Sequence, residues 1–123
     1  MNGLKKLLIV DDQAGIRMLL SEVFKNEGYD TILAANGIEA IRKLKEEEPD
    51  CLLMDLRMPG MDGKEVLQKI KTSYPDYPVV LMSAFSEEEM VRSVPGLRAD
   101  HYFKKPFDIH EVRRVINHLL EES

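Results

Sequence analysis

The chain has 123 residues, of which 44% are hydrophobic and 32% are charged, and its formal net charge is −5. This length and balance are typical of one globular domain with a buried core, so we expect a single domain over residues 1–123. The acidic charge argues against direct nucleic-acid binding, and no apolar stretch approaches the length of a membrane span.

Short apolar runs alternate with segments of helical periodicity along the chain. Residues 7–10 are continuously apolar, which is typical of a strand buried on both faces of a parallel sheet. Comparable strand-like runs follow at 31–34, 51–54, 79–82 and 101–104. A helical pattern follows each run, as with Ile16, Leu19, Leu20, Val23 and Phe24. Strand–helix repeated five times predicts an α/β fold, a parallel sheet with helices on both faces.

Helix-capping residues precede several of the predicted helices. Asn36 is placed to cap the second helix. Ser86 and Glu89 have the spacing of a capping box for the fourth helix, and Asp62 and Glu65 have the same spacing for the third.

The single cysteine, Cys51, lies at the start of the third apolar run. One cysteine cannot form an internal disulfide, and its apolar neighbours favour core packing. The N-terminus leads directly into the first strand-like run, which argues against a signal peptide. We therefore expect a cytoplasmic protein.

Polar residues stand at the ends of the apolar runs: Asp11 and Asp12, Asp55, Ser83 and Lys105. In sheets of this kind ligands bind at the carboxyl ends of the strands, so these side chains should share one edge. Three clustered carboxylates repel one another, and one should take up a proton unless a cation is bound. All-oxygen ligands favour Mg²⁺ or Mn²⁺, and Mg²⁺ in turn suggests a phosphoryl ligand.

Chemistry at this edge follows from the same residues. Carboxylates act as covalent nucleophiles, so we expect Asp55 to accept a phosphoryl group. Lys105 would add a second positive charge, and Ser83 would donate a hydrogen bond to a phosphoryl oxygen after transfer.

These residues resemble a known family, the receiver domains of bacterial two-component response regulators. The matching positions are Asp11-Asp12, Asp55, residues 58–63, Ser83-Ala84 and Lys105-Pro106. Further similarity, in residues 9–17, 35–37 and 105–109, points to the single-domain phosphorelay carriers of sporulating bacilli. The resemblance implies a flavodoxin-like (βα)5 fold, a doubly wound parallel five-stranded sheet with strand order 2-1-3-4-5.

The resemblance also implies a metal-dependent phosphoryl acceptor. Asp55 would accept the group from a phosphohistidine, while Asp12, Asp55 and the backbone carbonyl of Arg57 would hold Mg²⁺. Asp11 would assist, often through water. The chain would promote its own aspartyl phosphorylation and dephosphorylation without turning over a separate substrate.

Switch residues are implied in the same way. Ser83 would be the switch hydroxyl, and Tyr102 occupies the switch-aromatic position, although it could also be an ordinary strand residue. The Lys105-Pro106 bond would be cis. The family usually has Gly-Ala before the fifth strand, where this chain has Arg98-Ala99. Because Pro95-Gly96 lies just upstream, we expect a short or irregular fourth helix.

The partners implied are a histidine kinase or histidine phosphotransferase, and also an aspartyl-phosphate phosphatase, with the protein itself a monomer. The expected docking surface comprises Ala14, Gly15, Ile16, Met18, Leu19, Pro106 and Phe107. Helical periodicity requires at least one of Ile16 and Leu19 to face the core, so only part of this surface can be free.

Other functions fit the sequence less well. The chain ends soon after the fifth predicted helix, which favours a stand-alone carrier, but the amino-terminal receiver of a DNA-binding response regulator without its output domain would look the same. A phosphatase with an aspartate nucleophile would have a second acid two residues after Asp55, but this chain has Arg57 there, which argues against that function. Flavin binding is also disfavoured, because Asp11 and Asp12 would repel the flavin phosphate.

Overall fold

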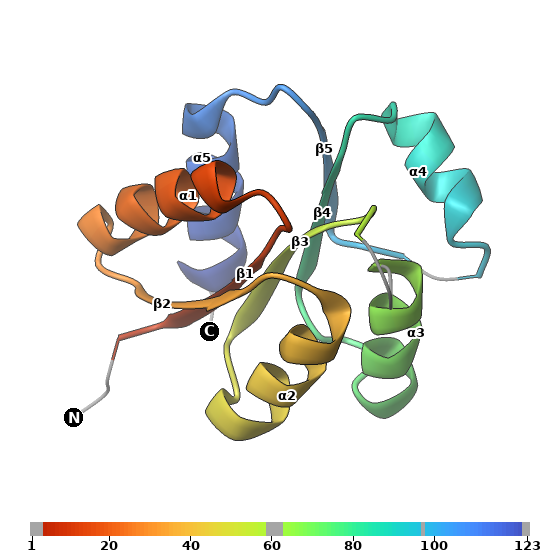
Figure 1. Cartoon of the computed structure of the whole chain (residues 1–123), viewed down its shortest axis with the longest axis horizontal. Coiled ribbons are helices and arrows are strands. Elements are labelled where there is room, and N and C mark those ends of the chain that lie inside the picture. The colour runs from red at the N-terminus through yellow and green to blue at the C-terminus, as the bar shows by residue number, and fades with distance from the viewer. Residues whose placement is uncertain (1–3, 59–62, 97, 122–123) are drawn as a thin grey trace.

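The computed structural model describes residues 4–58, 63–96 and 98–121. Strands and helices alternate through these residues (Figure 1). In chain order they are β1 (Lys6–Val10), α1 (Ala14–Asn26), β2 (Asp30–Ala34), α2 (Gly37–Glu47), β3 (Cys51–Asp55), α3 (Gly63–Ser73), β4 (Val79–Ser83), α4 (Glu87–Ser93), β5 (His101–Lys104) and α5 (Ile109–Glu121). The alternation predicted from the sequence is confirmed.

All five strands belong to one parallel sheet, and their spatial order is β2-β1-β3-β4-β5. The expected order 2-1-3-4-5 is therefore confirmed. Every residue of β3 and β4 is buried, which explains why these strands are continuously apolar up to their last residue. Asp55 ends β3 and Ser83 ends β4, so each breaks the apolar pattern at the same edge of the sheet.

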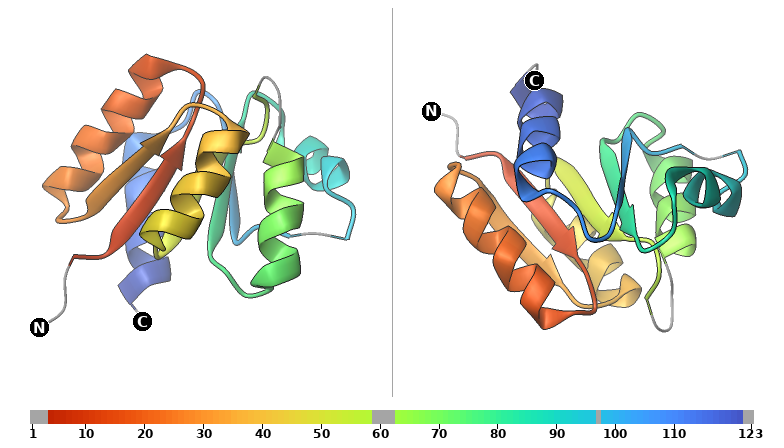
Figure 2. Two further views of the ribbon diagram at one scale, coloured as in Figure 1. Left: turned by 60° about the horizontal axis from the view of Figure 1, so that its bottom comes forward. Right: turned by 90° about the horizontal axis from the view of Figure 1, so that it is seen from above.

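Helices cover both faces of the sheet, with α1 and α5 on one side and α2, α3 and α4 on the other (Figures 1 and 2). Alternate residues of each central strand supply the two cores. Leu7 and Ile9 pack with Phe24 of α1 and Ile116 of α5, whereas Leu8 packs on the opposite side. The two faces of the molecule are therefore separated by the full thickness of the sheet.

Local signals account for the positions of several helix ends. The Asn36 side chain accepts a hydrogen bond from the Glu39 amide at 2.9 Å, and Ser86 with Glu89 forms a complete capping box. Both predicted caps are confirmed, whereas the one proposed at Asp62 lies outside the described residues. Helix α4 has only seven residues and ends before Pro95, as expected for a shortened fourth helix.

None of the helices in the described ranges has the length and apolar character that crossing a bilayer requires.

Candidate functional site

The carboxyl ends of the three central strands bring the predicted site residues together. Asp11 follows β1 directly, Asp55 ends β3 and Ser83 ends β4. In the register of the sheet Val10 pairs with Met54, the residue before Asp55. The topology thus accounts for the meeting of residues that lie far apart in the sequence.

An acidic cluster occupies this edge. Carboxylate oxygens of Asp11, Asp12 and Asp55 all lie within 4.8 Å of one another. Asp11 and Asp55 are buried, while Asp12 is exposed and open to solvent. Two carboxylates from the loop after β1 and one from the last residue of β3 form the hard oxygen donor set that suits a divalent cation. The cluster can hold a metal ion.

Lys105 is the positive charge of the site. Its Nζ lies 2.7 Å from Oδ2 of Asp11 and 3.1 Å from Oδ2 of Asp55, and it also donates to Oε1 of Gln13 at 3.3 Å. The Lys105-Pro106 peptide bond is cis, as the family resemblance implied. One ammonium group therefore bridges two of the three acids, and in doing so offsets part of their repulsion.

Both charged partners have shifted pKa values. Burial is the largest effect on Asp55 and raises the pKa of its carboxyl, and the negative charge of Asp11 raises it further. The hydrogen bond from the Arg57 amide and the contact with Lys105 lower this pKa but do not outweigh burial. For Lys105, burial acts to lower the pKa, but the hydrogen bonds and charges of Asp11 and Asp55 outweigh it and raise the pKa. Asp55 is thus a carboxylate held at an energetic cost, which a bound cation would relieve.

The segment after β3 orients the Asp55 carboxylate. The Arg57 amide donates to Oδ1 of Asp55 at 3.1 Å, leaving Oδ2 for Lys105. Gly63 at the start of α3 donates from its backbone to the Leu56 carbonyl at 2.9 Å. A Cβ on Gly63 would lie only 2.7 Å from the Leu56 Cα, so this close approach requires glycine.

Ser83 and Tyr102 lie on neighbouring strands. The Ser83 side chain is buried, and its Oγ accepts from the Phe85 amide at 3.2 Å. The Tyr102 hydroxyl accepts from the Ala99 amide at 3.1 Å, and its ring packs against the core on the α4 side of the sheet. The switch roles expected for these two residues stay predictions.

Two contacts at the site were not expected from the sequence. The Arg57 guanidinium lies 4.9 Å from the centroid of the Phe85 ring, so its charged end turns toward the β4–α4 loop. Gln13 contacts Lys105 across the sheet edge. Neither the Arg57 nor the Gln13 contact has a sequence signal, because each depends on where two loops meet. The Arg57 carbonyl stays a predicted metal ligand.

The expected docking surface is only partly exposed. Ile16 and Phe107 pack at the edge of the core beneath α1 and α5, whereas Met18 and Leu19 are 67% and 51% exposed. Ala14, Gly15 and Pro106 are exposed as well. Of the pair Ile16 and Leu19, it is Ile16 that faces the core.

Comparison with known sequences identifies the family. The family model for the response regulator receiver domain matches residues 7–117. The chain is 46% identical over 116 residues to sporulation initiation phosphotransferase F of Bacillus subtilis, covering 94% of each protein. It is 36% identical over 121 residues to the regulatory protein AtoC of Escherichia coli, but spans only 26% of that longer protein.

Comparison with solved structures gives the same result. The response regulator TrrA of Thermotoga maritima, solved in complex with Mg²⁺-BeF, matches with a TM-score of 0.83 and 34% identity. The match covers 95% of this chain and all of TrrA. From its fold, the acidic edge of its sheet and the family match over most of its length, the chain belongs to the response regulator receiver domains.

Proposed function

We propose that this protein accepts a phosphoryl group from a phosphohistidine onto Asp55, in a reaction that requires Mg²⁺. The observation that supports this most directly is the position of the Asp55 carboxylate. It ends a buried strand, contacts Lys105 at 3.1 Å, and stands beside two further acids that can hold a cation. Burial raises the pKa of this carboxyl, and perturbed pKa values are typical of functional sites.

Different residues of the site have different roles in the proposed transfer. Asp12, Asp55 and the Arg57 carbonyl would hold Mg²⁺, with Asp11 acting through water, and a cation bound there offsets charge on the transferring oxygens. A carboxylate oxygen of Asp55 forms the new bond to phosphorus while the bond from phosphorus to the histidine nitrogen breaks. Lys105 then contacts a phosphoryl oxygen, and Ser83 donates a hydrogen bond to another.

The partners proposed are a histidine kinase and a histidine phosphotransferase, because the Bacillus subtilis relative is named as a sporulation phosphotransferase. Coverage of 94% of both proteins supports a stand-alone phosphorelay carrier. We propose that this carrier is a monomeric single domain in the cytoplasm. The surface of Met18, Leu19 and Phe107 would dock the donor next to Asp55. A further proposed partner is a phosphatase that removes the phosphoryl group from Asp55.

A second candidate is the receiver of a longer, DNA-binding regulator. The chain is also 39% identical to the DNA-binding transcriptional regulator NtrC of Escherichia coli, which makes this alternative worth testing, but it spans only 25% of that protein, so the comparison favours the stand-alone carrier. The site chemistry would be the same in both, and only the recipient of the signal would differ.

Labelling with acetyl phosphate tests the proposal. With Mg²⁺ the wild type should gain one phosphoryl group, detected as an intact-mass shift that hydroxylamine reverses. Asp55→Asn should gain none, and chelation of Mg²⁺ should also prevent labelling. Asp76→Asn, in the exposed loop after α3, is the matched control and should be labelled like the wild type. Persistent labelling of Asp55→Asn would refute the assignment.

A further inference from the structure

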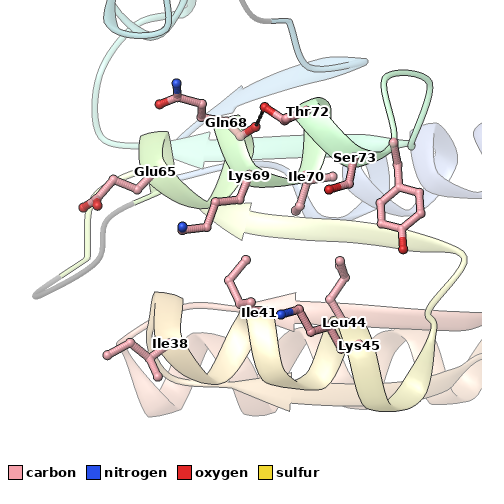
Figure 3. A pocket seen from close by; sticks show the side chains of 11 residues that line it. Ile38, Ile41, Leu44, Lys45, Glu65, Gln68, Lys69, Ile70, Thr72 and Ser73 are labelled. Atoms are coloured by element: carbon pink, nitrogen blue, oxygen red, sulfur yellow. Dashed lines mark hydrogen bonds between the residues drawn. The ribbon is translucent and has the colours of Figure 1, made fainter.

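A groove between α2 and α3 lies away from the acidic site and has no role in the proposed transfer. It encloses about 780 Å³. Figure 3 shows Ile41 and Leu44 pointing from α2 toward α3, with Ile70 of α3 facing them. These three side chains form an apolar floor between the two helices.

Exposed apolar residues extend this floor at both ends of the groove. Ile38 is 67% exposed at the start of α2, and Tyr74 is 57% exposed just after α3. Both count among the few large apolar side chains that the described residues leave in solvent. A continuous apolar strip of this kind is typical of a protein–protein contact.

The groove is lined by more basic than acidic side chains. Lys45 of α2 and Lys69 of α3 stand along its two sides, and Glu65 is the acid that lines it. Neither lysine forms an ion pair with any residue in the described ranges. The groove therefore carries a local positive charge on a chain whose net charge is −5.

The groove favours an acidic partner over a second copy of this chain. A twofold pairing would bring the same groove of two copies together, and each groove is lined by two lysines and one glutamate, so two surfaces with an excess of positive charge would meet. An acidic helix meets Lys45 and Lys69 with opposite charge instead.

We propose that the α2–α3 groove is a docking site for an acidic amphipathic helix of a partner protein. Helix α2 has 11 residues, which at about 1.5 Å per residue is about 16 Å, or three turns of a bound helix. Apolar side chains at positions i, i+4 and i+7 of the partner would contact the floor. Acidic residues on both flanks would face Lys45 and Lys69.

The position of the groove makes its occupancy compatible with phosphotransfer. It lies on the α2–α3 face of the sheet, whereas Met18, Leu19 and Phe107 belong to the α1–α5 face. A helix bound in the groove would leave the docking surface for the phosphoryl donor free. Two partners could therefore bind one molecule at once.

The experiment uses a synthetic 14-residue peptide with leucines at i, i+4 and i+7 and glutamates on both flanks. The full chain, labelled with ¹⁵N, is titrated with this peptide and with a version in which lysines replace the glutamates. The acidic peptide should shift amide signals of α2 and α3, and the basic one should bind at least roughly tenfold more weakly. The result should be the same for Asp55→Asn, so it does not depend on phosphorylation.

Two variants of the protein distinguish the contribution of the lysines to peptide binding from that of the apolar residues. Lys45→Glu/Lys69→Glu should weaken binding of the acidic peptide roughly tenfold, the equivalent of 1.4 kcal/mol. Ile38→Ser should weaken it without changing the preference for acid over base. The matched control is Lys25→Glu/Arg98→Glu, which makes the same charge change at exposed positions outside the groove and should bind like the wild type.

Three outcomes would overturn the proposal. One is equal binding of the acidic and basic peptides. Another is no binding, or signal shifts confined to α1 and α5. The third is a concentration-dependent shift of α2 and α3 signals without peptide, which would assign the groove to a second copy of the chain.

Discussion

Nζ of Lys105 lies 3.1 Å from Oδ2 of Asp55, and the two residues are 50 positions apart in the sequence. The same ammonium group donates to Asp11 at 2.7 Å. Lys105 therefore occupies the position of a cation among the acids, and a bound metal ion would act in the same electrostatic field. Competition between the lysine and the metal follows from this geometry.

Replacing Lys105 should separate metal binding from the phosphoryl contact. Lys105→Ala should bind Mg²⁺ as well as the wild type, or up to roughly tenfold more tightly, because a competing positive charge is removed. Binding of beryllofluoride, a phosphoryl mimic, should weaken by at least roughly tenfold in the presence of Mg²⁺. Calorimetric titration measures the first and ¹⁹F NMR the second.

Lys104→Ala is the control for this pair of measurements, because Lys104 is the exposed neighbour in β5. It should leave both affinities unchanged. If Lys105→Ala lost Mg²⁺ binding, the lysine would be organising the metal site, and its role as a phosphoryl contact would be contradicted.

The buried charge of Asp55 should reduce stability in the absence of metal. Burial is the largest cause of its raised pKa, so the folded state binds the proton more tightly than the unfolded state. This contribution is favourable below the ordinary carboxyl pKa and is lost as the pH rises through the raised value. Asp55→Asn should therefore unfold at a higher temperature than the wild type at pH 7 without Mg²⁺.

Thermal unfolding followed by circular dichroism over a range of pH tests this sign. The gain from Asp55→Asn should shrink in acid, where the wild-type carboxyl is already protonated. Asp76→Asn, at an exposed position, should show little change at any pH. A lower unfolding temperature for Asp55→Asn at pH 7 would mean that the contact with Lys105 outweighs the cost of burial.

Gly63 should be required for the position of Asp55 as well as for stability. A Cβ at Gly63 would lie 2.7 Å from both the Cα and the carbonyl oxygen of Leu56, the residue after Asp55. Gly63→Ala should cost about 1–3 kcal/mol of unfolding free energy. It should also slow labelling by acetyl phosphate, since Leu56 must shift.

Gly15 offers a matched comparison within α1, because no atom lies within 4 Å of a Cβ added there. Gly15→Ala should raise the unfolding free energy by about 0.5–1 kcal/mol and leave labelling unchanged. Urea denaturation and intact-mass labelling measure both effects. Equal stability of the two alanine variants would contradict the close approach at Gly63.

Substitutions in the exposed part of α1 should affect phosphoryl transfer from a protein donor but not labelling by acetyl phosphate. Leu19→Ala should slow transfer from a phosphorylated histidine phosphotransferase by roughly tenfold, which corresponds to the loss of one apolar anchor. Labelling by acetyl phosphate should not change. Ile16→Ala should also slow transfer, but since Ile16 packs against the core, it should lower stability too.

Ile38→Ala provides the control, because Ile38 is as exposed as the α1 residues but lies on the α2–α3 face. Its rate of transfer should equal that of the wild type. If Leu19→Ala slowed both reactions equally, Leu19 would be acting through the fold rather than through a partner.

The sequence was sufficient to predict the sheet and the edge at which the site lies. Strands buried on both faces are apolar throughout, so Asp55 and Ser83 stand out where those runs end. Parallel topology then requires strand ends to meet. The prediction depended on burial and connectivity, which are both visible in a residue pattern.

Contacts between loops could not be predicted in the same way. The pairing of Arg57 with the Phe85 ring and of Gln13 with Lys105 depends on side-chain rotamers and on the distance between loops. Periodicity also assigned Leu19 and Leu20 to the same helical face, yet Leu20 is buried and Leu19 is half-exposed. The width of the buried stripe on α1 is set by how α5 packs beside it, which the sequence of α1 does not contain.

The most direct test of the account is to locate the phosphorylated aspartate. An acyl phosphate is reduced by borohydride to an alcohol, so phosphorylated aspartate becomes homoserine, which tandem mass spectrometry can place in a peptide. After acetyl phosphate and Mg²⁺, homoserine should occur at position 55 and at neither Asp11 nor Asp12. Homoserine at Asp11 or Asp12, or none at position 55 in a labelled protein, would contradict the assignment of Asp55 as the phosphoryl acceptor.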